Sequence, residues 1–378
     1  MISFLIKIYF KMIVSSWKAV GFGKLLLVRI YLLPLFGIFT AITLALDKFL
    51  YPEFQRVVIK KPVFIIGHPR SGTTFLHRLI ADDCFVEFKF WQIAFPSLTG
   101  RKILQPFIDY ILKSKKNIMK SKKNVLFPVE VGHKMELDDV EEEELLFFHI
   151  LNTQFLTLIS PIGFSDWDFN ELVYNDLQPE EVREKSMDFF RGCLQRQAYY
   201  LQRTQVVSKI NYSGMRLKSL FHAFPDARVI YLVRSPLETQ NSHFSLHRNI
   251  FNHLWGLDKL RDKRMLPRYY QRRYQHNVAF YSYLEDLLEN GSVPLNQILV
   301  LNYNEMRDDP ENALQQFFSF TGIHPSERLK QKIQSQLKNQ KSYQAKHRNI
   351  DLTEFGISKE QIIDDLQAVF KKYGFSVK

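Results

Sequence analysis

The chain has 378 residues, 46% of them hydrophobic, which is enough to bury a substantial core. It contains only two cysteines, Cys84 and Cys193, which excludes a small disulfide-rich scaffold and favours two free thiols. The formal net charge of +12 suits nucleic acid, anionic lipid or an anionic small molecule as a partner. We expect no nucleic-acid partner, because no zinc-finger spacing, RNA-recognition signature or homeodomain pattern is present.

The first 56 residues differ in composition from the rest, and we predict a membrane-associated segment over residues 1–56 followed by a domain over residues 57–378. The apolar stretch Ile30–Leu46, extended by Leu25–Val28, reaches the roughly 20 residues that cross a bilayer, and Pro34 is expected to kink it. Basic and aromatic residues precede it, as in helices of the membrane interface: Lys7, Tyr9, Lys11, Trp17, Lys18, Lys24 and Arg29. Membrane contact through residues 1–50 is therefore predicted. A spanning helix, an interfacial anchor and a helical hairpin packed on the domain are all open.

Residues 63–76, VFIIGHPRSGTTFL, predict a buried strand, a glycine-rich loop and a helix N-terminus. In this geometry, inward-pointing backbone N–H groups and the helix dipole cradle a phosphate. Gly67 and Gly72 have the spacing of a Walker A loop, but Thr73 stands where that loop has its lysine. Arg70 is the cation inside the loop. The pattern therefore suits a nucleotide with a single 5′-phosphate that carries a transferable group.

A second motif lies at residues 227–245, ARVIYLVRSPLETQNSHFS, where another apolar strand ends in Arg234. Ser235 and Pro236 follow with the pattern of a helix N-cap and a first helical residue. Ser242 lies about two turns into that helix. Arg234 and Ser242 are therefore candidates to hold one phosphate together.

These two motifs, in this order, resemble those of the sulfotransferases, in particular the bacterial-type branch. Those enzymes move a sulfuryl group from 3′-phosphoadenosine 5′-phosphosulfate (PAPS) to an acceptor hydroxyl or amine. The resemblance implies that PAPS is the cosubstrate, with its 3′-phosphate on Arg234 and Ser242. It also implies a 5′-phosphosulfate loop made of Arg70, Ser71, Gly72, Thr73 and Thr74. Residues 297–322 match the family's C-terminal strand–turn–helix, so the resemblance extends from about residue 60 to the end.

The periodicity after residue 60 alternates between helical patterns and short apolar runs typical of parallel strands buried on both faces. The expected strands are Val63–Ile66, Gln205–Lys209, Arg228–Val233 and Ile298–Asn302. Helices are expected roughly over residues 187–202 and 272–290, and from a cap at Ser358 to Gly374. We predict an α/β fold of three layers, P-loop NTPase-like, with a central parallel sheet, helical insertions and the apolar N-terminal membrane-associated segment.

Sulfuryl transfer resembles phosphoryl transfer with less charge on the moving group, so fixed cations suffice and no metal ion is expected. Arg70 is predicted to stabilise charge on the sulfuryl oxygens, the alternative being that it only neutralises the 5′-phosphate. Lys209 ends a strand at a position where the resemblance implies a lysine near the sulfuryl group. A lysine that merely extends into solvent is the alternative.

The general base is the least certain assignment, because Asn211 stands where cytosolic animal sulfotransferases have a catalytic histidine. The segment His133–Glu144, rich in acidic residues, resembles the acidic helix start of bacterial-type relatives. Helix capping explains most of this run. We assign the base to Glu142 or Glu143, whose pKa mutual repulsion would raise. The rival candidates are histidines: His133 and, more weakly, His243 and His247.

The acceptor is expected to be a small molecule, a lipid or a glycan, since the N-terminal segment and the aromatic content favour an apolar alcohol. Six lysines within residues 113–123 form either a solvated helix face or a contact with anionic lipid. Basic residues before the apolar stretch place the N-terminus in the cytosol, so a single span would give a type II protein of the Golgi lumen. The bacterial-type resemblance favours a cytoplasmic catalytic domain instead. A kinase-like P-loop enzyme and an inactive nucleotide-binding relative are the alternative functions.

Overall fold

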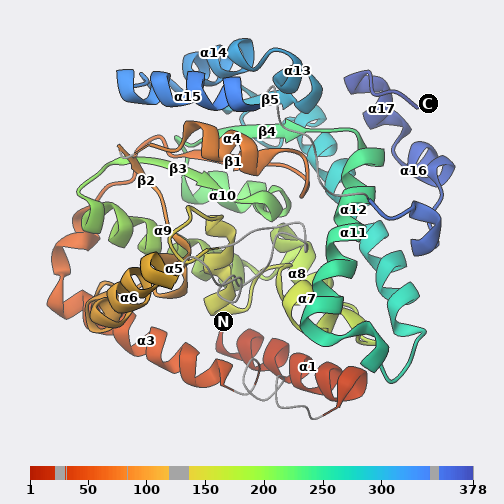
Figure 1. Ribbon diagram of the computed structural model, residues 1–378, viewed down its shortest axis with the longest axis horizontal. Coiled ribbons are helices and arrows are strands. Elements are labelled where there is room, and N and C mark those ends of the chain that lie inside the picture. Colours follow the sequence, from red (N-terminus) through yellow and green to blue (C-terminus); the bar gives the residue numbers. More distant parts are fainter. Residues whose placement is uncertain (22–29, 31, 83, 119–135, 341–348, 378) are drawn as a thin grey trace.

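The computed structural model describes the chain except residues 22–29, 31, 83, 119–135, 341–348 and 378. In the described residues, five parallel strands form one sheet in the order β2-β3-β1-β4-β5 (Figure 1). Their bounds are β1 (Val63–Ile66), β2 (Phe85–Val86), β3 (Gln205–Lys209), β4 (Arg228–Val233) and β5 (Ile298–Asn302). The four strands expected from the sequence are confirmed at these bounds, and β2 is an addition.

The sheet is buried on both faces, as its continuous apolar strands require. In β1, Val63 and Ile65 join one hydrophobic core, whereas Phe64 and Ile66 join the other, because successive side chains of a strand point to opposite faces. All four are fully buried. The predicted three-layer α/β architecture is therefore confirmed.

Helices cover the two faces of this sheet. The core that contains Val63 and Ile65 packs against α4 (Thr73–Ile80), α13 (Tyr303–Asp308), α14 (Pro310–Thr321) and α15 (Glu327–Gln340). The larger core on the other face includes α9 (Glu180–Leu201), α10 (Leu217–Ala223), α11 (Pro236–Trp255), α12 (Met265–Glu289), α16 (Lys359–Asp365) and α17 (Gln367–Tyr373). Figure 1 draws α14 and α15 above the strands, and α9 and α10 below them.

The final helix differs from the expectation. Ser358 caps it as predicted, since its Oγ accepts the N–H of Gln361 at 3.0 Å. The single helix expected up to Gly374 is nevertheless two helices, because the backbone leaves the helical conformation at Leu366 (φ −122°, ψ 25°). The expected helices over 187–202 and 272–290 are α9 and α12, and both begin about two turns earlier than predicted.

Helical insertions lie between β2 and β3. They are α5 (Phe90–Ala94), α6 (Leu98–Ile118), η4 (Glu143–Ile150), α7 (Leu156–Ile159), η5 (Pro161–Phe164), α8 (Asn170–Val173) and η6 (Asn175–Leu177), η denoting a 3₁₀ helix. The other 3₁₀ helices are η2 (Pro52–Arg56), η7 (Asn211–Arg216), η8 (Leu257–Lys259), η9 (Leu295–Gln297) and η10 (Leu352–Phe355). The lysine-rich stretch 113–123 continues α6 as far as Ile118, and its remainder lies outside the described residues. Cys84 and Cys193 are both free, as expected.

Two helices at the N-terminus, α1 (Ile2–Val20) and α3 (Leu33–Leu50), pack against the rest of the chain. α1 contributes Ile8 and Met12 to the larger core. α3 is the described helix that is long and apolar enough to cross a membrane, and only 17% of it is buried. Pro34 does not kink it, contrary to our expectation. It lies in the first turn, where its missing N–H is not needed.

Candidate active site

The loop between β1 and α4 has a backbone that only certain residues tolerate. A Cβ on Gly72, which has φ 94°, would lie 2.5 Å from the ring of Tyr303. A Cβ on Gly67 would lie 2.5 Å from the carbonyl oxygen of Leu232. Arg70 adopts φ 75°, a left-handed conformation that is unfavourable for a residue with a side chain. Backbone strain of this kind concentrates at functional sites.

The residues present in this loop fit an anionic group. The first N–H groups of α4 have no acceptor within their own helix, and Gly72 at its N-cap offers no side chain to cap them. The hydroxyl of Ser71 is buried and has no hydrogen-bond partner among the described residues. Thr74 is held at its Oγ1 by the ammonium group of Lys209 at 2.9 Å. Unused donors and positive charge therefore converge on the loop.

The second motif meets this loop directly, because β4 is the neighbour of β1 in the sheet. Nη1 of Arg234 donates a hydrogen bond to the carbonyl oxygen of Arg70 at 2.9 Å. Nε of Arg70 donates to Oγ of Ser242, also at 2.9 Å. The structure thus brings together Arg70, Arg234 and Ser242, which are far apart in sequence. Ser242 contacts the arginine of the first motif rather than that of its own.

Two residues near Arg234 were not found by the sequence reasoning. Glu238 forms an ion pair with Arg234 at 2.6 Å, one helical turn away on α11. The guanidinium of Arg234 also lies 4.1 Å from the centroid of the Tyr303 ring. The i,i+4 spacing from Arg234 to Glu238 was the one signal in the sequence that could have indicated the ion pair.

Lys209 connects the acidic run to the phosphate loop. Its side chain is 2% exposed, so the alternative of a lysine extending into solvent was wrong. Besides Thr74, its Nζ lies 3.2 Å from Oε2 of Glu142. The same carboxylate oxygen accepts the side-chain N–H of Asn211 at 2.9 Å. Asn211 therefore positions a carboxylate.

The neighbouring glutamates have different surroundings. Glu143 is fully buried, and its Oε2 accepts the backbone N–H of Lys209 at 2.8 Å. Glu144 is also fully buried, accepting from Ser213 at 2.5 Å and pairing with Arg216 at 3.3 Å. We had expected helix capping to explain most of this acidic run. The structure contradicts that expectation for these residues, because no side-chain cap bond forms at the start of η4. Glu143 and Glu144 instead form hydrogen bonds and an ion pair inside the protein.

The pKa values of the candidate bases are shifted by a cause other than the one we expected. Burial, rather than repulsion between carboxylates, is the largest effect that raises the pKa of Glu143 well above its usual range. Burial also lowers the pKa of His243 and that of His247 well below the usual range, which makes both imidazoles weak proton acceptors. His133 lies outside the described residues.

Comparison with known proteins identifies the class. Residues 62–327, more than half of the chain, match the model of the sulfotransferase family, so the chain belongs to that family. Over 337 residues it is 25% identical to omega-hydroxy-beta-dihydromenaquinone-9 sulfotransferase Stf3 of Mycobacterium bovis and of Mycobacterium tuberculosis. The match covers 85% of this chain and 77% of those proteins. The protein is therefore a sulfotransferase, as the motifs predicted, rather than a kinase-like enzyme.

Solved structures agree with the fold. Sulfotransferase STF9 from Mycobacterium avium is similar with a TM-score of 0.69 and 17% identity, covering 88% of this chain and 82% of that one. Sulfotransferase STF1 from Mycobacterium tuberculosis is similar with a TM-score of 0.70 and 16% identity, covering 96% and 92%. The three-layer arrangement around a parallel sheet is thus that of sulfotransferase structures.

Proposed function

We propose that this sulfotransferase uses PAPS as its donor. The 5′-phosphosulfate binds the loop formed by Arg70, Ser71, Gly72, Thr73 and Thr74, and the 3′-phosphate binds Arg234 and Ser242. One observation carries this proposal: Arg234 and Ser242 both contact Arg70 at 2.9 Å, one through its carbonyl oxygen and the other through its guanidinium. Because the two anion-binding motifs are hydrogen-bonded to each other, they suit one molecule that carries a phosphate at each end.

When bound, PAPS supplies a sulfuryl group on a phosphate leaving group. Arg70 and Lys209 stabilise the negative charge that develops around the transferred group, and Arg70 acts only electrostatically, because arginine keeps its proton. Glu142 removes the proton of the acceptor hydroxyl while the oxygen of that hydroxyl forms the new bond to sulfur. The bond from sulfur to the bridging phosphate oxygen breaks, which releases adenosine 3′,5′-bisphosphate and the sulfated acceptor.

Glu142 is our preferred base, and its surroundings support this choice. Its carboxylate lies 3.2 Å from the ammonium group of Lys209, which in turn contacts the phosphate loop at Thr74. Glu143 is the weaker candidate, because it is fully buried, its Oε2 already accepts the backbone N–H of Lys209, and its raised pKa favours the protonated form. His133 is the third candidate, and substitution distinguishes the three.

The acceptor we propose is a lipid-like alcohol. A relative that is 25% identical is named for a hydroxylated dihydromenaquinone. An apolar N-terminal helix supports the same class of acceptor. In this proposal, residues 1–56 bring the catalytic domain, residues 57–378, to the cytoplasmic side of a membrane. A glycan or an amine acceptor and a Golgi type II arrangement are the alternatives.

A ligand-binding test and an activity test check this function. Thermal unfolding of the full chain is measured with adenosine 3′,5′-bisphosphate and with ATP, and only the bisphosphate is expected to raise the midpoint strongly. Radiolabelled PAPS is then incubated with a membrane-lipid extract, and label is expected in an apolar product. Equal stabilisation by ATP, or label confined to water-soluble glycans, would overturn the donor or the acceptor assignment respectively.

A further inference from the structure

Helix α3 has the reverse of the polarity that a helix on a water-soluble protein shows. Its buried residues are the polar Thr40, Thr43 and Asp47. Its outward residues are large and apolar, at intervals of three or four that place them on one face. They are Leu35, Ile38, Ile42, Leu46 and Phe49, with exposed fractions from 40% for Leu46 to 81% for Phe49. A helix of this kind presents hydrocarbon to its surroundings and polar groups to the protein.

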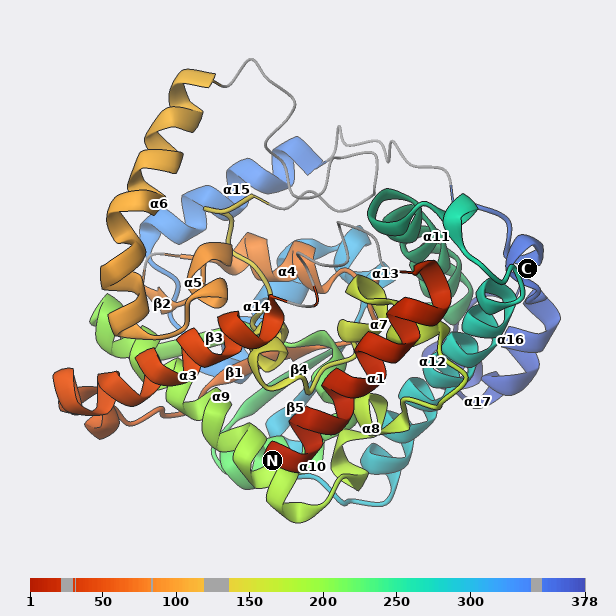
Figure 2. The same cartoon turned by 90° about the horizontal axis from the view of Figure 1, so that it is seen from below.

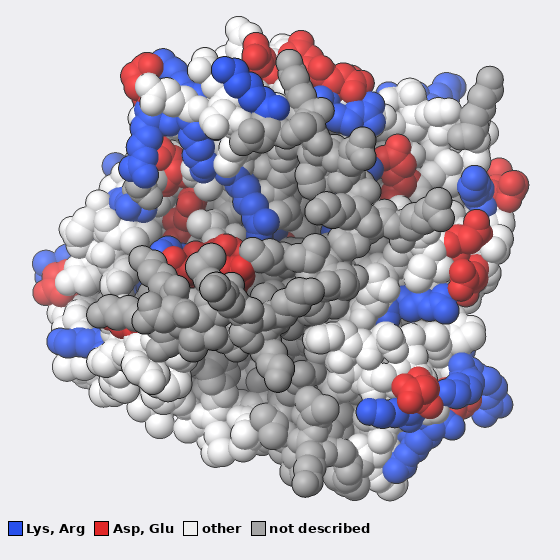
Figure 3. All heavy atoms as spheres, viewed as in Figure 1, with Lys and Arg blue, Asp and Glu red and all other residues white. Residues whose placement is uncertain are grey.

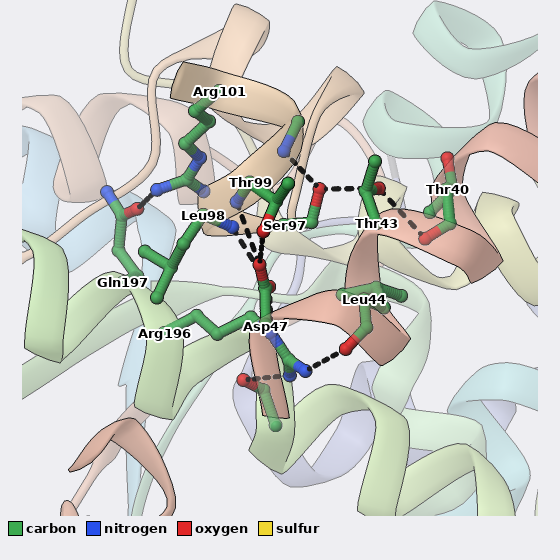
Figure 4. Close-up of polar contacts among 12 residues, drawn as sticks. Thr40, Thr43, Leu44, Asp47, Ser97, Leu98, Thr99, Arg101, Arg196 and Gln197 are labelled. Carbon is green, nitrogen blue, oxygen red and sulfur yellow. Dashed lines mark hydrogen bonds and ion pairs between the residues drawn. The ribbon is translucent and has the colours of Figure 1, made fainter. Parts of the chain in front are cut away.

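A buried polar network holds α3 in this orientation (Figure 4). Asp47, which is 0% exposed, accepts the backbone N–H groups of Leu98 and Thr99 at 3.0 and 2.8 Å, at the start of α6. It also pairs with Nε of Arg196 on α9 at 2.7 Å. Ser97 adds a hydrogen bond to Thr43 at 2.8 Å. A bilayer-spanning α3 would lose these contacts and leave buried charges unpaired, so α3 lies along the protein.

Two further helices extend the outward apolar surface of α3. α1 exposes Ile2 (75%) and, at four-residue intervals, Ile6 and Phe10, while Ile8 and Met12 face the core. α6 exposes Ile103, Phe107 and Tyr110 on one face. Seen from below, Figure 2 shows α1 and α3 in front of the sheet, with α6 beside them. We call the exposed apolar residues of these three helices the apolar face: Ile2, Ile6, Phe10, Trp17, Leu35, Ile38, Ile42, Leu46, Phe49, Leu50, Ile103, Phe107 and Tyr110.

Positive charge gathers at the edge of this face. The C-terminal end of α1 meets the segment after α11, where the N–H of Arg261 donates to the carbonyl oxygen of Ala19 at 2.9 Å. This segment and the first turn of α12 expose basic side chains: Lys259, Arg261, Lys263, Arg264 and Arg268. Asp262 pairs with Arg264 at 3.0 Å and with Arg268 at 3.7 Å, so basic residues remain in excess. Figure 3 shows a mainly basic cluster, with some acidic spheres in it, at the lower right, and uncharged spheres at the lower left, where Figure 1 draws α3. Each basic residue near a membrane favours anionic lipid by roughly 1 kcal/mol.

We propose that α1, α3 and α6 form one monotopic docking surface that lies in the plane of a bilayer and binds anionic lipid at its basic edge. This proposal deepens the membrane association within the proposed function, because it names the surface and excludes a spanning helix. The inverted polarity of α3 and the basic edge favour a bilayer over a second copy of the chain, which would bring a like-charged edge to the same contact.

The test is flotation of the full chain with lipid vesicles. We expect binding to vesicles of phosphatidylcholine and phosphatidylglycerol, and weaker binding to phosphatidylcholine alone. The double variant Ile38→Glu/Ile42→Glu should lower the partition coefficient by about thirtyfold or more, because each half-exposed isoleucine loses apolar burial in the lipid. The matched control Leu177→Glu/Leu295→Glu changes two exposed apolar residues outside the apolar face, 77% and 51% exposed, and should float like the unmodified protein.

Thermal stabilisation by adenosine 3′,5′-bisphosphate, measured on every variant, separates this proposal from the donor assignment. A docking variant that keeps the stabilisation but does not float supports the docking surface. The proposal is overturned if the unmodified protein does not float, or if Ile38→Glu/Ile42→Glu floats as well as the control. It is also overturned if the unmodified protein is a dimer in solution that does not bind vesicles, and Ile38→Glu/Ile42→Glu is a monomer.

A depth measurement distinguishes in-plane docking from a spanning helix. In a Cys84→Ser background, a bilayer-sensitive fluorophore is attached to cysteine at Leu35, Ile42 or Phe49, which mark the two ends and the middle of the outward face of α3. The depth of the fluorophore in the bilayer is measured by quenching with labelled lipids. Docking in the plane predicts the same shallow depth at all three positions. A label at Ile42 near the bilayer centre, with the two ends shallow, would show a spanning helix and contradict the proposal.

Discussion

The substitution Glu142→Gln tests the proposed base most sharply, because glutamine keeps the size of the side chain and can still accept the hydrogen bond of Asn211. The change removes the negative charge 3.2 Å from the ammonium group of Lys209 and the ability to take a proton. A positioned general base contributes about a hundred- to ten-thousandfold to the rate. We therefore expect kcat to fall by that factor, about 3–5 kcal/mol of activation free energy. The binding of adenosine 3′,5′-bisphosphate should hardly change.

Glu143→Gln is the matched control one residue away. Burial raises the pKa of Glu143 and so favours its protonated form, which glutamine imitates. We expect kcat to fall less than about tenfold, well below the loss from removing a general base. The assay is transfer of label from PAPS to the apolar product, from which kcat is determined for both variants and for the unmodified protein. The reasoning is refuted if Glu142→Gln keeps its activity while Glu143→Gln abolishes it.

Three further predictions concern charge. Glu238→Gln should tighten the binding of adenosine 3′,5′-bisphosphate severalfold in calorimetry, because Glu238 pairs with Arg234 at 2.6 Å and competes with a phosphate; weaker binding would contradict this. Asp47→Ala should lower the free energy of unfolding by about 3–5 kcal/mol in urea, since it leaves Arg196 buried without its carboxylate; a loss below about 1 kcal/mol would show that the pair contributes little. Burial raises the pKa of Glu87 from 4.5 to about 8, so the folded state keeps a proton that the unfolded state releases. The free energy of unfolding should therefore fall as pH rises between these values, by up to ~1.4 kcal/mol per pH unit. Glu87→Gln should abolish this decline, and an unchanged pH dependence of the melting midpoint would refute the assignment.

The sheet could be predicted from the sequence, because its long strands are continuous apolar runs. Gln205–Lys209 ends at a lysine and Arg228–Val233 is followed directly by Arg234, and the structure keeps those bounds. β2 was missed because Phe85–Val86 has only two residues and lies within an aromatic stretch that also suits a helix. The loop residues were found because two glycines with this spacing after a strand indicate a tight loop without room for side chains. At Gly72, a Cβ would lie 2.5 Å from the ring of Tyr303.

The partners of the acidic run and of Asp47, which are distant in sequence, could not be predicted. The acidic run looked like a solvated helix start, since nothing local shows that Lys209 and Asn211 receive Glu142. The inverted polarity of α3 was equally hidden. In the sequence, Asp47 directly follows the apolar stretch, where an acidic residue usually faces water. Only the fold brings the start of α6 and Arg196 to its carboxylate.

Calorimetry with two ligands tests the central claim most directly, namely that Arg234 and the loop around Arg70 bind opposite ends of one nucleotide. The unmodified protein should bind adenosine 3′,5′-bisphosphate about ten- to a hundredfold more tightly than adenosine 5′-monophosphate, the range expected for hydrogen bonds to a charged group. Arg234→Ala should lose this preference while keeping its affinity for the monophosphate, and Arg234→Lys should restore part of it. If Arg234→Ala weakens both ligands equally and leaves their ratio unchanged, Arg234 does not bind the 3′-phosphate.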